Sequence, residues 1–202
     1  RVGKNAYAHT IRDSMVTGAA FYQTISGTTV SGTSHPASPD QATSSLPISD
    51  SQIASWEADA EAGGITSAPC PYKPANGAVL GPRKITCDVE FKNVTVTIAG
   101  AVWVTGKVTI KGSTIRVDPA LGKKSVPIVV DNPANRLTSS TITLETTSSF
   151  AGSGAGNSFI LLLSQNRSAE AGGAVSAVAV QQPSTGDLLV YAGHGRVTIA
   201  QS

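Results

Sequence analysis

Between residues 85 and 117 the chain alternates apolar and polar residues in short bursts. Successive side chains of a β-strand point to opposite sides, so each burst predicts a short strand with one apolar face. Glycines between the bursts allow the backbone angles that tight corners need. The bursts cover residues 94–98, 102–104, 108–110 and 115–117, and the glycines are Gly100, Gly106 and Gly112. The stretch therefore predicts strands and corners rather than helices.

The bursts recur at a spacing of about twenty residues. Val94 and Ile115 are 21 residues apart, Val89 and Val108 are 19 apart, and three bursts fit inside each interval. Such a repeat predicts an all-β fold, a single-stranded parallel β-helix in which the apolar side chains of one coil stack on those of the next. An antiparallel meander with glycine-containing turns would give the same alternation. The spacing favours the β-helix over the meander.

One helix is predicted at about residues 50–62. Ser49 followed by Gln52 resembles a capping box, and Gly63 and Gly64 mark the end. Ile53 and Trp56 recur at helical spacing and predict a stripe that covers an open end or a side of the β-core. The acidic residues Glu57, Asp59 and Glu61 are expected to point mostly to solvent.

The remaining chain predicts further strands and no second domain. Early strands are expected within residues 1–33, as a first coil or cap of the β-helix or as a segment that pairs with a neighbouring subunit. Residues 34–46 are rich in proline and serine and predict a surface loop. The expected organisation is an N-terminal part, 1–66, with the early strands, loop and helix, followed by the β-helix at 67–202, in one structural domain.

The two cysteines, Cys70 and Cys87, predict a disulfide that pins a proline-rich connector onto the first coil. A disulfide implies an oxidising compartment, so an extracellular or cell-surface location is expected. Aromatic residues are only 5% of the chain, so the core must be built from small branched side chains. No apolar run is long enough to cross a membrane, and any membrane attachment is expected to use a segment outside this chain.

Basic residues are concentrated in the middle of the chain. Lys92, Lys107, Lys111 and Arg116 are candidate contacts for a polyanion or a glycan. The alternative, which the absence of interleaved aromatic residues favours, is that they keep the strand faces soluble and protect the sheet edges. No nucleic-acid partner is expected.

No catalytic or cofactor motif is recognisable. His9, His35 and His194 lie in no nucleophile motif, although the glycines beside His194 would expose it at a corner. Asp88, Glu90, Asp118 and Asp131 are candidates for the acidic residues of a polysaccharide-cleaving β-helix, but the favoured explanation is that they are outward residues at corners. The expectation is a protein that is not an enzyme, with no cofactor and no metal site.

The order of several segments resembles one family. The segments are FYQTISGTTV, LPISDSQIASWEADAEAGG, LGPRKITCDVEFKNVTVTIAGAVWVTGKVTIKG, SVPIVVDN and VYAGHGRVTI. They are similar to predicted secreted, pilin-like surface proteins of small-genome, candidate-phylum bacteria. The resemblance implies a β-helical ectodomain that follows a hydrophobic pilin-type helix, and it supplies no catalytic residues.

These observations lead to three functional hypotheses. The first is a non-catalytic subunit of a cell-surface appendage or pilus-like filament, which self-associates with identical subunits. The second is a β-helix that binds or cleaves carbohydrate, and the third is an adhesin domain.

Overall fold

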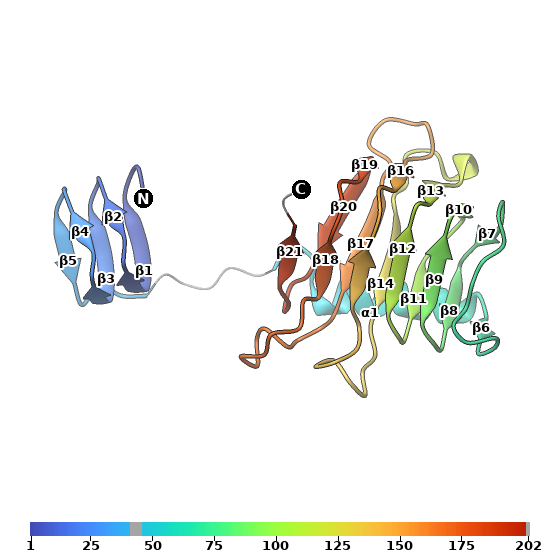
Figure 1. The fold of residues 1–202 in the computed structure, drawn as a ribbon, viewed down its shortest axis with the longest axis horizontal. Helices are drawn as coiled ribbons and strands as arrows, with labels where there is room; N and C mark the ends of the chain where they lie inside the picture. Colours follow the sequence, from blue (N-terminus) through green and yellow to red (C-terminus); the bar gives the residue numbers. More distant parts are fainter. Residues whose placement is uncertain (41–45, 201–202) are drawn as a thin grey trace. The chain divides into compact units, whose positions relative to one another are not determined.

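The structure, a computed structural model, describes residues 1–40 and 46–200 and divides the chain into two compact units, Arg1–Leu46 and Pro47–Ser202 (Figure 1). The division lies about twenty residues earlier than the boundary near residue 66 that the sequence suggested. The boundary lies earlier because the helix after Leu46 packs on the second unit, where Ile53 is only 3% exposed.

The N-terminal unit is a small parallel β-solenoid of its own. One sheet has the order β1-β3-β5 and the other pairs β2 with β4, and all these pairings are parallel. The strands are β1 (Ala6–Arg12), β2 (Met15–Val16), β3 (Ala20–Ser26), β4 (Thr29–Val30) and β5 (Ser34–Pro36). Equivalent positions are 14 residues apart, as in the hydrogen bond between the hydroxyls of Thr10 and Thr24. The segment predicted as a loop thus begins with a strand, and its residues 41–45 lie outside the described residues.

The second unit is a parallel β-helix built from three sheets. The first sheet has the order β19 (Thr185–Gly186), β16 (Ser149–Ala151), β13 (Thr114–Val117), β10 (Thr95–Ile98), β7 (Val79–Leu80). The second has the order β20 (Leu188–Tyr191), β17 (Ile160–Ser164), β14 (Val126–Val130), β11 (Val102–Val104), β8 (Arg83–Ile85), β6 (Ile65–Thr66). The third has the order β21 (Val197–Ile199), β18 (Val178–Val180), β15 (Ile142–Leu144), β12 (Val108–Lys111), β9 (Val89–Lys92). Every strand pair is parallel, which confirms the β-helix and excludes the meander.

The early coils of the β-helix follow the predicted repeat closely. Val89 pairs with Val108, as expected, and equivalent positions are 19 residues apart. Ile115 pairs with Val96 instead of Val94, so the predicted spacing of 21 is two residues too long there. Later coils are longer, with 35 residues between Thr114 and Ser149, because loops are inserted between their strands.

The inside of the β-helix is filled by ladders of branched side chains. Val102, Ile128 and Leu162 are paired in successive coils of the second sheet, and each is at most 1% exposed. The strands β14 and β17 are buried along their whole length. Side chains of a strand alternate between two faces, so something must also cover the outer face of this sheet.

That cover is α1 (Asp50–Ala62), which matches the predicted helix. The Ser49 side chain accepts a hydrogen bond from the Gln52 backbone N–H at 3.2 Å and so caps the first turn. Ile53 packs against outward side chains of the second sheet, which include Trp103, Val129 and Leu163. The helix therefore covers a side of the β-helix and not an end, one of the two positions that the sequence allows.

The helix extends across several coils. Before its first turn, the backbone carbonyl of Ile48 accepts a hydrogen bond of 2.9 Å from the Tyr191 hydroxyl, at the end of β20. In its last turn, Glu61 forms a 2.9 Å ion pair with Lys84 of β8. The Lys84 ammonium also lies 3.8 Å from the centre of the Trp103 ring. One helix thus joins coils from both halves of the stack.

Within residues 1–40 and 46–200, no helix has both the length and the apolar character that crossing a membrane requires.

Candidate functional site

Cys70 and Cys87 form the predicted disulfide, with their Cα atoms 5.9 Å apart. The bridge holds the connector that precedes β7 against the turn between β8 and β9. Next to it, Tyr72 forms a parallel bridge with Val89 and covers the first residue of the third sheet. The disulfide thus anchors a segment that lies over the first coil, and it is consistent with an oxidising environment.

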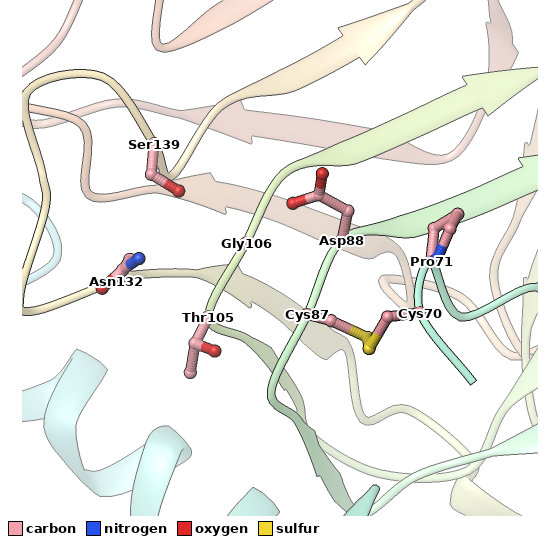
Figure 2. Close-up of a pocket in the computed structure, with 8 residues that line it drawn as sticks. All are labelled: Cys70, Pro71, Cys87, Asp88, Thr105, Gly106, Asn132 and Ser139. Atoms are coloured by element: carbon pink, nitrogen blue, oxygen red, sulfur yellow. A yellow bond between two sulfur atoms is a disulfide. The ribbon is translucent and has the colours of Figure 1, made fainter. Parts of the chain in front are cut away.

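A polar cavity of about 470 Å³ lies beside this disulfide. It follows the corner between the second and third sheets through three successive coils, and its lining consists of Cys70, Pro71, Cys87, Asp88, Thr105, Gly106, Asn132 and Ser139. Figure 2 shows the disulfide on one side of Gly106 and the side chains of Asn132 and Ser139 on the other. The Asp88 carboxylate points into this corner and accepts a hydrogen bond of 2.8 Å from the backbone N–H of Lys107.

Gly106 allows the coils to approach closely at this corner. A Cβ atom there would lie 2.6 Å from the backbone nitrogen of Asp88 and 2.7 Å from the carbonyl carbon of Cys87. We therefore expect Gly106→Ala to lower the free energy of unfolding by about 1–2 kcal/mol, since the two coils must move apart. Urea unfolding measures this value. Gly156→Ala is the control, because no atom lies within 4 Å of a Cβ added there, and an equal loss in both variants would contradict the expectation.

The predicted basic residues do not form one patch. Lys92, Lys107 and Lys111 lie on or beside the strands β9 and β12 and line a second cavity of about 280 Å³ together with Glu90 and Glu145. Arg116 belongs to β13 of the first sheet, where its Nε donates to the Thr97 hydroxyl at 2.9 Å.

Carboxylates reduce the positive charge of this lysine cavity. Glu90 pairs with Lys73 at 2.6 Å, and Glu145 pairs with Lys111 at 3.3 Å. The hydrogen bond from Lys73, together with the surrounding lysine charges, lowers the pKa of Glu90, so this carboxylate stays ionised. The face carries mixed charges, which is typical of a solvated sheet face and unlike the uniform positive surface that polyanion binding requires.

Two of the four candidate catalytic residues, Asp88 and Glu90, line the lysine cavity together, and the other two lie elsewhere. Asp118 caps a short 3-10 helix, η1 (Pro119–Leu121), and Asp131 follows β14 of the second sheet. The three histidines are also separate. His9 pairs with Asp40, His35 stacks on Phe21 with ring centroids 4.3 Å apart, and His194 lies between Asp50 and Glu170. Among the described residues, no three His, Cys, Asp or Glu side chains are placed to bind a metal ion.

A buried ionic cluster lies under α1 and includes Glu57, so the expectation that Glu57 points to solvent is wrong. The Asp131 side chain is 1% exposed and accepts two hydrogen bonds from Arg136, at 2.7 Å from Nε and 2.6 Å from Nη2. The Trp103 indole donates to the Asp131 backbone carbonyl at 2.9 Å. Glu57 of α1 faces this pair. Burial in the first place, and the Asp131 charge in the second, raise the pKa of Glu57 to about 8.

The large apolar side chains that remain exposed are concentrated in terminal coils. Two belong to β6 and β7 at the start of the β-helix and three to β20 and β21 at its end: Ile65, Val79, Leu189, Val197 and Ile199. Three more, Val2, Tyr7 and Met15, are in the first coil of the N-terminal unit. Leu46 and Leu137 are the remaining two such side chains among the residues described.

The last coil leaves the core of the β-helix open. Val178 is fully buried, and its partner in the next coil, Val197, is 42% exposed. Ile199 pairs with Val180 and is 72% exposed. Both side chains continue interior ladders of the third sheet, so they are exposed because no further coil covers them in this structure.

These features define the chain as a parallel β-helix protein with a disulfide-anchored first coil and a lateral helix. Comparison of the chain with known protein families, curated proteins and solved structures finds no match. The pilin-like resemblance in the sequence therefore stays a prediction.

Proposed function

We propose that the protein is an extracellular, non-catalytic structural subunit that assembles end to end through the terminal coils of its β-helix. The observation that carries this proposal is the uncovered core at β21, where Val197 and Ile199 offer apolar surface and unpaired strand edges. A parallel strand of a second copy would cover both, since edge strands add further strands readily.

The opposite end of the β-helix supplies a suitable partner surface. The strands β6 and β7 each pair on one side only, so their other edges are free to pair with strands of a second copy. Stacking β7 and β6 of one copy beyond β19 and β20 of the next keeps all strands parallel. Head-to-tail contacts of this kind produce a filament when the rotation between subunits does not close into a ring. The disulfide supports an extracellular location, and the pilin-like resemblance agrees with an appendage.

We expect the purified protein to form oligomers whose size increases with concentration, and the double variant Val197→Lys/Ile199→Lys to stay monomeric. Two charges in the uncovered core would have to lose their water when a second copy stacks there. Light scattering after size-exclusion chromatography and negative-stain electron microscopy measure the assembly.

Leu137→Lys is the matched control, because Leu137 is 52% exposed but lies in a loop away from the terminal coils. This variant should assemble like the unmodified protein. Monomers at every concentration tested, or the same assembly in the double variant, would contradict the proposal.

A further inference from the structure

A small cavity lies between the N-terminal half of α1 and the ends of β14 and β17, with a volume of about 210 Å³. Its lining consists of Asp50, Ile53, Ala54, Glu57, Asp131, Arg136, Gln165 and Arg167. Val130 pairs with Ser164, so the residues that follow them, Asp131 and Gln165, take equivalent positions in adjacent coils. The helix and the sheet belong to the same compact unit, so the walls of the cavity keep fixed positions relative to each other.

Unpaired polar atoms are concentrated in this cavity. Four buried side-chain nitrogen or oxygen atoms lack a hydrogen-bond partner in the described part of the chain, and three of them, Glu57 Oε1, Gln165 Oε1 and Arg167 Nε, belong to its lining. Gln165 is only 3% exposed. A buried polar atom without a partner is costly, and a group of them in one cavity indicates that something else supplies the missing hydrogen bonds.

The charges around the cavity are already balanced. Arg136 holds Asp131 through two hydrogen bonds, and Arg167 Nη2 lies 3.5 Å from Asp50 Oδ2. Glu57 carries a proton at neutral pH, since its pKa is raised to about 8. An anionic ligand would meet Asp50 and Asp131, and a cationic ligand would meet the two guanidinium groups. The arrangement therefore favours a neutral ligand.

The unpaired atoms also indicate which groups that ligand carries. Arg167 Nε–H can only donate a hydrogen bond, and Gln165 Oε1 can only accept one. A hydroxyl group does both, so one hydroxyl can accept from Arg167 and donate to Gln165. The protonated Glu57 carboxyl shares a hydrogen bond with Asp131, so its unpaired oxygen Oε1 can accept from a second hydroxyl, while Ile53 and Ala54 offer an apolar side. A ligand with adjacent hydroxyls on a compact carbon frame matches this set.

We propose that this cavity binds a single neutral sugar residue through Gln165, Arg167 and Glu57. The volume corresponds to roughly seven water molecules at about 30 Å³ each, enough for one pyranose ring and below the range of about 300–1,000 Å³ that larger ligands occupy. The site lies on the side of the β-helix, and its lining includes neither Val197 nor Ile199. Substitutions in the cavity therefore test a different set of residues from those that test the proposed assembly.

The test is a titration of the full chain with neutral hexoses and N-acetylhexosamines, followed by ligand-observed NMR. Glucuronate and glucosamine serve as charged comparators. We expect saturable binding of at least one neutral sugar at millimolar concentration and weaker binding of both charged sugars. If methyl glycosides bind as well as the free sugars, the ligand is the end of a glycan. If only the free sugar binds, the ligand is a soluble monosaccharide.

Gln165→Met keeps the size of the side chain and removes its acceptor, so we expect it to weaken binding by about tenfold or more. Gln182→Met is the matched control, because Gln182 is exposed and distant from the lining, and it should bind normally. If Gln165→Met does not fold, the side-chain amide signals of Gln165 in the unmodified protein must shift during the titration. No saturable binding of any neutral sugar, or equal binding by Gln165→Met, overturns the proposal and indicates that water fills the cavity.

Discussion

Leu162→Ala is expected to lower the free energy of unfolding of the β-helix by about 3–4 kcal/mol. Leu162 is fully buried and stacks between Ile128 of the preceding coil and Val190 of the following one. Alanine would leave a cavity in the middle of this ladder, and strands on both sides hold the coils at a fixed distance, so they cannot collapse into the space. The loss should therefore be near the upper part of the range for large-to-small substitutions.

Urea unfolding followed by tryptophan fluorescence measures this loss. Both tryptophans of the chain, Trp56 and Trp103, lie in the β-helix unit, so the signal reports that unit alone. Leu137→Ala is the control, since Leu137 is exposed in a loop and should change the free energy of unfolding by less than about 0.5 kcal/mol. A loss for Leu162→Ala as small as that of the control would show that the interior is not tightly stacked.

The β-helix is expected to lose about 2–3 kcal/mol of stability through Glu57 alone as the pH rises from 5 to 9. The pKa of Glu57 is about 8 in the folded protein and near 4.5 in an unfolded chain. Between these values the folded state binds a proton that the unfolded state releases, so stability falls as the pH rises through this window. The expected loss of stability is about half of the value that the full pKa shift of Glu57 would give, because Glu57 is partly exposed and solvent screens its charge.

Glu57→Gln removes this proton and should flatten that part of the pH dependence. Urea unfolding at pH 5 and pH 9 measures the difference for both proteins. Asp59→Asn is the control, since Asp59 lies on the same helix but is exposed, and it should keep the pH dependence of the unmodified chain. Equal slopes for Glu57→Gln and the unmodified protein would show that Glu57 ionises normally beside Asp131.

The sequence predicts the β-helix well where a coil carries no insertion. From β9 to β13 every coil position recurs after 19 residues, so alternation and glycine corners are visible directly. After β13 the loops separate strands that still stack, and Val108 pairs with Ile142 at a spacing that no regular repeat predicts. The stacking of coils depends on the contacts between side chains inside the β-helix. A solvent-exposed loop changes the number of residues between two stacked strands but leaves those contacts unchanged.

The N-terminal unit contains a signal that the interpretation of the sequence missed. Ala6 pairs with Ala20, and Ile11 pairs with Ile25, at the 14-residue spacing of this unit. Gly18 and Gly32 are also equivalent positions, where a side chain would collide with the neighbouring coil. The pattern is weak because coils this narrow bury few large side chains.

In the candidate sites, too, features that depend on residues close in the sequence were predicted, and features that depend on residues far apart in the sequence were not. The helix cap at Ser49 and the disulfide depend on residues close in the chain, and both were predicted. The cavity under α1 depends on contacts such as that between Asp50 and Gln165, which are 115 residues apart. Nothing near either residue marks the pairing, because it is the packing of α1 on the second sheet that brings them together.

The path of α1 has a mechanical consequence. A column of stacked coils under tension would normally peel from one end, since each coil is held only by its neighbours. Here Glu61 is tied to β8, and Ile48 and Asp50 are tied to Tyr191 and His194 near the other end. A pulling force must therefore detach the whole helix before the coils between these points can separate. We expect forced unfolding to occur in one large step rather than in a series of small ones.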